Sequence, residues 1–173
     1  MKDRSLKFLA KIFAYCYQHS QRLQKRLMRD SYGHLWRRGG QGPYMLRYRV
    51  VDTGTWQSAA LKALTLGKYD HCRLHVIMQP DVDRELHNHP FNYRTFILDG
   101  WYREERPGGK RNVLTGNTVT GAGYHRIALV PPDGVTTLFF MGKDRGEWGF
   151  MVDGKHVTSR EFFATKRGTN GTV

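Results

Sequence analysis

Short extended segments separated by turn residues are the feature of this sequence that most limits its fold. From Tyr44 onward, apolar residues alternate with polar ones or form short apolar runs, and Gly, Pro or Asp bounds most of them. Segments of strand length fall at residues 44–50, 72–78, 95–98, 127–130, 136–141 and 148–152. Many short strands with turns between them predict an all-β fold, an antiparallel sandwich or barrel. Residues 55–67 are the exception, because an Ala- and Leu-rich run ending at Gly67 favours a short helix.

Residues 1–43 differ from this pattern and are predicted to form a basic helical extension with a linker. Residues 1–49 contain 12 Lys or Arg against two Asp, whereas residues 50–173 contain 16 Lys or Arg against 13 acidic residues. Helical spacing gathers one apolar stripe from Leu9, Ile12, Phe13, Cys16, Leu23 and Leu27. We expect the stripe to pack on the main domain or on a second copy of the chain, as a homodimer. The alternative is that the basic segment docks on nucleic acid or on an anionic membrane surface.

The N-terminal apolar run and the two cysteines indicate the cellular compartment in which we expect this protein. Lys7 and Lys11 interrupt the apolar run that a secretion signal needs, and no window has the length of a transmembrane helix. Cys16 and Cys72 lack the spacing of metal ligands, so we expect two free thiols in a reducing compartment. The sequence thus predicts a cytoplasmic protein with one β-domain at residues 44–165 and a short, flexible, polar tail at residues 166–173.

The residues best suited to chemistry are the histidines of the run His87-Asn88-His89-Pro90. Side chains two positions apart on an extended strand point to the same face, so His87 and His89 present two imidazoles side by side, as one edge of a transition-metal site requires. Taken alone, the pair is explained equally well by chance among eight histidines. A third histidine, His125, follows a glycine-rich turn at residues 120–124. The three together favour a metal site.

This layout resembles the cupin superfamily, in which an H-x-H motif precedes a strand–glycine–strand hairpin and a later glycine turn leads to a further histidine. The match runs over residues 87–100 and 121–125, and residues 81–105 together with residues 148–150 are similar to small single-domain cupins of phage and bacterial genomes. The resemblance implies a jelly-roll barrel, also called a double-stranded β-helix, with a divalent metal near its mouth. It implies that His87, His89 and His125 are the metal ligands.

One departure from the cupin motif bears on the metal. The glutamate that usually follows the second histidine is missing, and Tyr93 and Arg94 stand at the corresponding positions. The resemblance therefore implies a three-histidine site, as in the thiol dioxygenases, with Fe(II) as the first expectation and Zn, Ni or Mn as alternatives. Three neutral imidazoles leave the full charge on the ion, which favours an anionic or thiol-bearing substrate and leaves positions open for substrate and oxygen.

Further residues are expected around this centre. Tyr93 is the candidate catalytic residue, as a hydrogen-bond or proton donor, with ordinary packing in the barrel as the alternative. Glu85, two residues before His87 on the same strand face, is expected to orient a histidine or to form a surface ion pair, and the alternative is that it supplies the carboxylate that the motif lacks. Candidate substrate-binding residues, which the resemblance would place near the barrel mouth, are Arg73, His75, Arg94, Tyr102 and Arg126. Outward-pointing arginines that merely keep the sheet soluble are an equal alternative. Residues 104–106 are expected to form a solvated turn, and residues 160–163 a closing strand or a docking segment.

Three functions remain open from the sequence. The first is a metal-binding cupin, a non-haem iron oxygenase of the dioxygenase type, acting on a small molecule. The second is a non-catalytic cupin scaffold whose basic residues 1–43 bind nucleic acid, an anionic surface or a protein. The third is an isomerase or epimerase of the sugar type, because one fold hosts many reactions.

Overall fold

The protein is described here by a computed structural model. It describes residues 8, 10–13, 15, 16, 19–23, 35, 36, 43–121, 123–144 and 146–169, with side chains as far as residue 166 and without those of residues 35 and 36. Most of the predicted extension at residues 1–43 and the end of the predicted tail, residues 170–173, lie outside this description. The described residues between 8 and 23 are largely helical, as the apolar spacing predicted.

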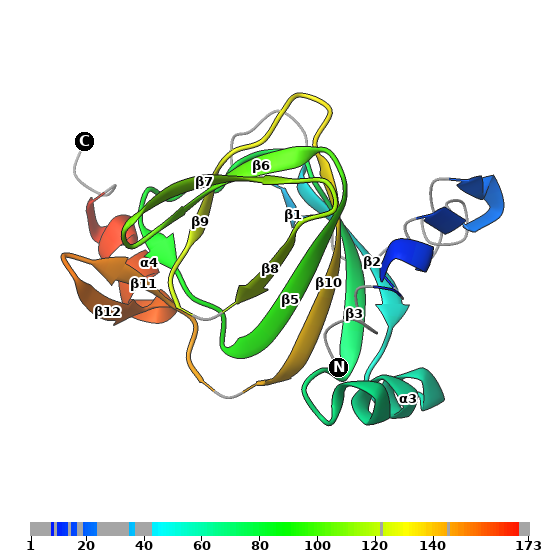
Figure 1. Cartoon of the computed structure of the whole chain (residues 1–173). Helices are drawn as coiled ribbons and strands as arrows, with labels where there is room; N and C mark the ends of the chain where they lie inside the picture. Colours follow the sequence, from blue (N-terminus) through cyan, green and yellow to red (C-terminus); the bar gives the residue numbers. More distant parts are fainter. Residues whose placement is uncertain are drawn as a thin grey trace.

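Antiparallel strands make up most of the described chain (Figure 1). In chain order they are β1 (Leu35–Trp36), β2 (Pro43–Val51), β3 (His71–Ile77), β4 (Leu86–His87), β5 (Phe91–Asp99), β6 (Trp101–Arg106), β7 (Gly109–Leu114), β8 (Thr118–Gly121), β9 (Arg126–Leu129), β10 (Val135–Asp144), β11 (Gly149–Val152) and β12 (Lys155–Thr158). Helix α3 spans Trp56–Thr65 and helix α4 spans Ser159–Thr169. Among the described helices, none has the length and apolar character needed to span a bilayer.

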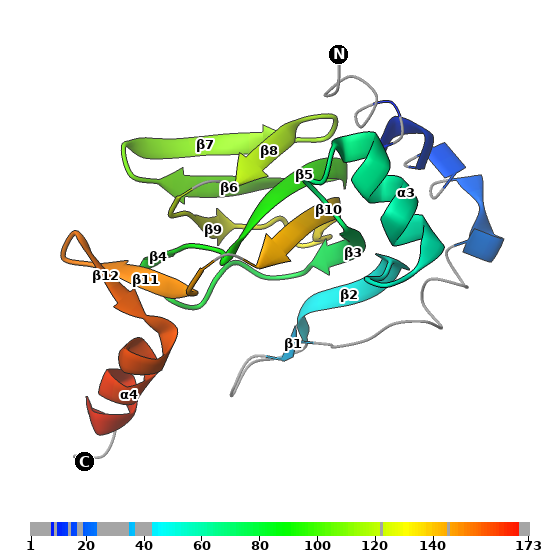
Figure 2. The same ribbon diagram turned by 90° about the horizontal axis from the view of Figure 1, so that it is seen from below.

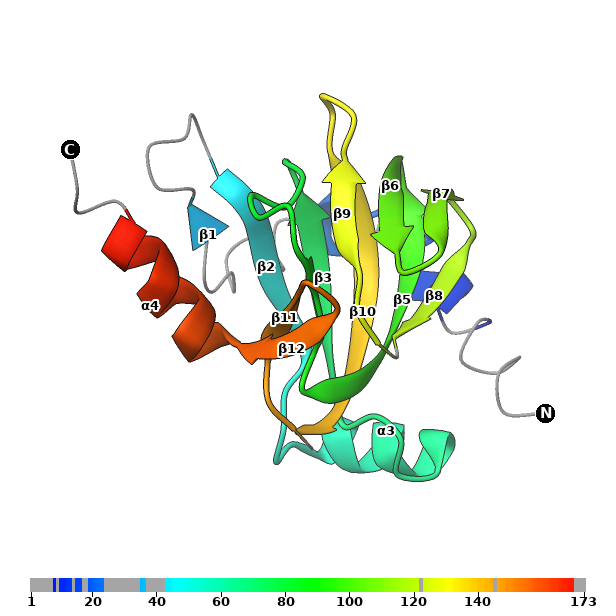
Figure 3. The ribbon, with the colours of Figure 1, turned by 90° about the vertical axis from the view of Figure 1, so that its left-hand side faces the viewer.

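The strands roll into a barrel built from one large sheet and two small ones. The large sheet has the order β1-β2-β3-β10-β5-β8, and the small sheets have the orders β12-β11-β4 and β7-β6-β9. Figures 1 and 3 show the small sheets facing the large one across the barrel, with α4 beside β11 and β12. The non-sequential order, in which β10 lies between β3 and β5, is that of a jelly roll rather than of a meander. The predicted all-β, cupin-type barrel is therefore confirmed.

Strand alternation gives the large sheet two different faces. On β3, Cys72, Leu74 and Val76 point outward, and Arg73, His75 and Ile77 point into the barrel. The outer residues form one apolar cluster with α3, and Figure 2 shows α3 against this side of the sheet, opposite α4. From the N-terminal segment, Ala10, Phe13 and Leu23 pack against the same cluster. The outer face of the sheet is thus covered by apolar side chains of α3 and of the N-terminal segment.

Helix α3 follows the predicted boundaries. Thr55 caps its start, where the hydroxyl accepts a hydrogen bond from the Ser58 backbone N–H at 3.2 Å. At its end Leu66 adopts a left-handed conformation with φ of 53°, and the backbone N–H of Gly67 donates to the Lys62 carbonyl at 2.8 Å. The helix covers the outer apolar cluster through Leu61.

The hairpin between β5 and β6 turns at Gly100, as the sequence predicted. Gly100 has φ of +75°, and a Cβ there would lie 2.7 Å from the carbonyl oxygen of Gly134. Only glycine meets both the backbone conformation and the close approach of the neighbouring turn. This turn leads the chain from the large sheet into the small sheet that carries β6 and β9.

Of the sequence-based expectations for local structure, the solvated turn at residues 104–106 and the closing strand at residues 160–163 are wrong. Residues 104–106 lie in strand β6, and Glu104 is fully buried, because the alternation that starts at Tyr102 points its side chain into the barrel. Residues 160–163 belong to helix α4, which begins at Ser159 after the side chain of Thr158 accepts a hydrogen bond from the Glu161 backbone N–H at 3.2 Å. The helix continues past residue 165, where the flexible tail was expected to begin, and Lys166 lies within it.

Candidate metal centre

The three predicted histidines come from separate parts of the fold and meet at one end of the barrel. His87 ends β4, His89 lies between β4 and β5, and His125 immediately precedes β9. The backbones of His87 and His125 pair through two hydrogen bonds of 2.8 Å, one in each direction. This bridge joins two of the sheets and fixes the two side chains next to each other.

The imidazole rings converge on a common point, as the spacing of the motifs predicted. One ring nitrogen from each histidine lies within 4.8 Å of the others, and His89 Nε2 is 3.0 Å from His125 Nε2. Metal–nitrogen bonds of about 2.1 Å place two ligands at right angles roughly 3.0 Å apart. The distances thus suit a divalent ion bound by the three rings.

A buried carboxylate that sequence reasoning missed orients His125. The His125 Nδ1–H donates to Glu104 Oε1 at 2.9 Å, which leaves Nε2 with a lone pair that faces His89. Arg106 donates to the same oxygen at 2.9 Å, and Arg111 donates to Oε2 at 2.7 Å. Burial alone would raise the pKa of Glu104, but the hydrogen bonds from His125, Arg106 and Arg111 outweigh it and lower the pKa to about 2. Glu104 therefore stays charged and holds the ring in one orientation.

A second carboxylate, also missed, stands beside His87. Asp81 Oδ2 lies 3.8 Å from His87 Nδ1 and accepts a hydrogen bond of 2.6 Å from the Ile127 backbone N–H. Its Oδ1 accepts the hydroxyl of Tyr44. The carboxylate is thus fixed from two strands, and it leaves the Nε2 side of His87 to the cluster.

Burial favours the neutral, metal-binding form of two of the histidines, His87 and His89. It lowers the pKa of His87, which Asp81 partly opposes. Burial lowers the pKa of His89 well below its ordinary value, and the neighbouring His125 and His87 add to this effect. Both rings therefore offer a lone pair near pH 7 without having to lose a proton first.

Tyr93 lies next to the cluster, as predicted. Its hydroxyl lies 3.3 Å from His125 Nε2. Its ring packs against the backbone of Gly121, at a distance where any larger residue would overlap it. Burial raises the pKa of Tyr93 and the charge of Glu104 adds to the effect, so the hydroxyl keeps its proton.

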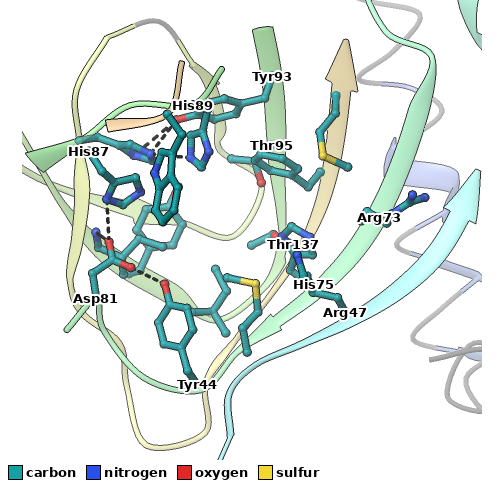
Figure 4. A pocket seen from close by; sticks show the side chains of 18 of the residues that line it. Tyr44, Arg47, Arg73, His75, Asp81, His87, His89, Tyr93, Thr95 and Thr137 are labelled. Atoms are coloured by element: carbon teal, nitrogen blue, oxygen red, sulfur yellow. Dashed lines mark hydrogen bonds and ion pairs between the residues drawn. The ribbon is translucent and has the colours of Figure 1, made fainter. Parts of the chain in front are cut away.

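The cluster opens into a cavity of about 530 Å³ inside the barrel (Figure 4). Its walls are mostly apolar and include Phe91, Phe139, Trp148, Phe150 and Phe163. Of the predicted substrate-binding residues, Arg73, His75 and Tyr102 line this cavity. The ring of His75 stacks on that of Phe139 at a centroid distance of 4.9 Å, and Arg73 donates to Asp52 Oδ1 at 2.8 Å.

The structure does not bring Arg94, Arg126 or Glu85 to the cavity. Arg94 lies between two inward residues of β5, so alternation turns it outward, where its Nε donates to Thr118 at 2.9 Å. Arg126 alternates with His125 and pairs with Glu105 at 2.6 Å. Glu85 lies 3.7 Å from Lys166 of α4 and orients none of the three histidines. The carboxylate that orients a histidine is Glu104 instead, while Asp81 lies 3.8 Å from His87.

The barrel and its histidine cluster together have the layout of a cupin domain with a three-histidine site, as the motifs predicted. No family model matches the sequence, and no curated protein matches it.

Solved structures that match in fold include a cupin-2 domain from Rhodospirillum rubrum, with 12% identity, coverage of 78% of this chain and 80% of that chain, and a TM-score of 0.47. A cupin 2 conserved barrel domain protein from Rhodopseudomonas palustris has 11% identity, coverage of 81% and 83%, and a TM-score of 0.48. The polyketide cyclase RemF from Streptomyces resistomycificus has 10% identity, coverage of 71% and 79%, and a TM-score of 0.47.

Proposed function

We propose that this protein is a metal-dependent enzyme in which His87, His89 and His125 hold a divalent ion beside the cavity. The observation that carries the proposal is the distance of 3.0 Å between two facing Nε2 atoms, with a nitrogen of the third ring close by. A single shared proton would satisfy two facing nitrogens, but a cation satisfies all three. Because Glu104 takes the Nδ1–H of His125, the Nε2 lone pair is available for that cation.

The residues around the three histidines have separate roles in the proposed site. Glu104 fixes the ring of His125, Asp81 lies beside that of His87, and Tyr93 keeps its proton next to the cluster, where its hydroxyl can donate a hydrogen bond to a bound molecule. The aromatic walls keep water away from a small, largely apolar substrate. A bound divalent ion would supply Lewis-acid chemistry, and Fe(II) in particular would supply the activation of dioxygen.

In its finer form, the proposal is a non-haem iron dioxygenase. Three neutral imidazoles leave the charge of the ion uncompensated, which favours an anionic substrate and leaves coordination positions open. Tyr93, which stands near the place of the missing glutamate, supports this proposal as a donor to oxygen-bearing groups rather than as a ligand, because its pKa is raised.

Elemental analysis of tag-free protein tests the proposal. We expect about one equivalent of a transition metal in the wild type and in His71→Ala, a control whose ring pairs with Asp70 outside the site. We expect no bound metal in the double variant His87→Ala/His125→Ala or in His89→Ala, whose backbone takes no part in the bridge. Equal metal content in all four proteins contradicts the proposal. Circular dichroism checks that each variant is folded.

The identity of the metal tests the finer form. We expect iron in protein purified without oxygen, and oxygen uptake when small organic acids are supplied to the Fe(II) form. Zinc or nickel as the native ion, with no oxygen uptake after loading with Fe(II), contradicts the dioxygenase and leaves the metal site in place.

A further inference from the structure

A second group of polar side chains lies inside the barrel, on the inner face of the large sheet. His75 of β3 pairs in register with Arg47 of β2 on one side and with Thr137 of β10 on the other. Thr95 of β5 lies in the next row, opposite Phe139. All of them line the same cavity as the histidine cluster, and Figure 4 shows them across the cavity from it.

Three of these side chains are buried without a hydrogen bond from the protein. The exposed fractions of His75, Thr95 and Thr137 are 9%, 5% and 1%. Among the described residues, no hydrogen bond engages the imidazole of His75 or the hydroxyl of either threonine. The fully buried polar atoms without a partner among the described residues do not include theirs, so these three groups reach the cavity and can hydrogen-bond to a molecule bound there.

The charges around the group favour an anion. Arg47 and Arg73 both line this part of the cavity. Burial and these two guanidinium groups lower the pKa of His75 to about 3, so its ring is neutral at pH 7 and carries an N–H to donate. Asp52 accepts from the Arg73 guanidinium at 2.8 Å, and Asp81 and Asp83 also line the cavity. Arg47 and Arg73 favour a negative charge near His75, because both act on the charge state of its ring.

We propose that His75, Thr95, Thr137 and Arg47 form an anion subsite that binds the carboxylate of a small organic acid. Two hydroxyls, one imidazole N–H and the planar guanidinium of Arg47 match the two oxygens of a carboxylate. The apolar body of the acid lies on Phe139, whose ring is 4.9 Å from that of His75 and 6.0 Å from that of His89. One aromatic ring thus separates the subsite from the histidine cluster.

This inference deepens the proposed function. Binding of the carboxylate does not depend on that function, but any reaction of the far end of the ligand at the metal site does. An acid anchored in this way would present its far end to His87, His89 and His125 and to the hydroxyl of Tyr93. The carboxylate would lie away from the metal site and would not be the reacting group. The subsite itself is testable without any metal.

Calorimetric titration of chelator-treated full-length protein tests the subsite. The probes are phenylacetate, 3-phenylpropanoate and hexanoate, each compared with its uncharged amide. We expect at least one acid to bind about tenfold more tightly than its amide, because the acid makes charge-assisted hydrogen bonds. Thr137→Val and His75→Leu are each expected to weaken that acid about tenfold, and Thr95→Val serves as a third variant should either fail to fold. The control Thr120→Val changes an exposed threonine of β8 and should bind as the wild type does.

Several results would overturn the subsite. The first is that no acid binds with a dissociation constant below about 10 mM. The second is that the amides bind as tightly as the acids. The third is that Thr137→Val and Thr120→Val bind the acid with equal affinity. Tighter binding of phenyl phosphate than of any of the acids would overturn the assignment to a carboxylate. Because the titration uses protein without metal, it succeeds or fails independently of the elemental analysis that tests the metal centre.

Discussion

The two faces of the large sheet use the same strands for opposite purposes. On the outer face, Leu74, Phe96 and Phe140 are buried under α3 and residues of the N-terminal segment. On the inner face, the alternate positions carry His75, Thr95 and other polar groups that face a cavity. The outer face is closed by apolar contacts, whereas the inner face combines an apolar cluster with polar groups that reach the cavity. We therefore expect substitutions on the outer face to change stability and substitutions on the inner face to change binding.

The largest effect is expected on the outer face. Leu74→Ala removes a side chain that is 1% exposed and should lower the free energy of unfolding by about 3 kcal/mol. Chemical denaturation measures this loss. Thr137→Val, equally buried on the inner face, should change the stability by less than about 1 kcal/mol, because it removes a hydroxyl with no partner and keeps the volume. Equal losses in the two variants would show that the faces do not differ.

The next effect concerns the carboxylate that orients His125. Glu104→Gln removes the charge that fixes the ring, so the affinity for a divalent ion should fall about 10- to 100-fold. Competition with a chromophoric chelator, using Zn²⁺ or Ni²⁺, measures it. Glu105→Gln is the matched control, because the neighbouring side chain pairs with Lys110 and Arg126 on the other side of β6. A similar loss in both variants would remove the orienting role of Glu104.

A pH effect is expected at His75. Its pKa is about 3 in the folded protein against an ordinary value of 6.5, so the unfolded chain takes up a proton that the folded chain does not. The folded state therefore loses stability as the pH falls below 6.5, by about 2 kcal/mol at pH 5 from this group. His75→Leu should lose correspondingly less stability than the wild type between pH 7 and pH 5 in urea titrations. Parallel curves for the two proteins would contradict this prediction.

The smallest effect distinguishes the two cysteines and leaves stability unchanged. Cys72 is buried on the outer face of β3, and burial raises its pKa, so its thiol should not react with iodoacetamide in the native state. Cys16 is exposed and should react. Peptide mass spectrometry locates the label, and unfolding in urea should release Cys72. Rapid native labelling of Cys72 would mean that the outer cluster opens.

The sequence predicted those parts of the site that local pattern encodes. His87 and His89 share a face because they are two positions apart. The glycine-rich turn before His125 indicated that this histidine is the third member of the cluster. Glu104 was missed because its acidic and basic neighbours suggested a solvated turn, although its alternation with Tyr102 pointed it inward. The same parity rule would have placed Arg94 and Arg126 outside, since each adjoins an inward residue.

Other features could not be predicted because they join distant segments. Asp81 is held by Tyr44 and by the backbone of Ile127, which lie far from it in the sequence. The subsite at His75 requires the order in which β2, β3, β10 and β5 are placed side by side, and no run of residues encodes that order. The positions of the strands could be predicted from the sequence, whereas the pairing of each strand with its neighbours in the sheet could not.

The backbone bridge between His87 and His125 has a consequence for the order of assembly. His89 and His125, which the bridge helps to bring together, are separated by 36 positions, and contacts at such separation form slowly and after local structure. The unfolded chain therefore offers only the neighbouring pair His87 and His89, a weak chelate. We expect the chain to fold in the absence of a divalent ion and to bind one afterwards, so that removal of metal by a chelator should leave the amount of folded protein unchanged.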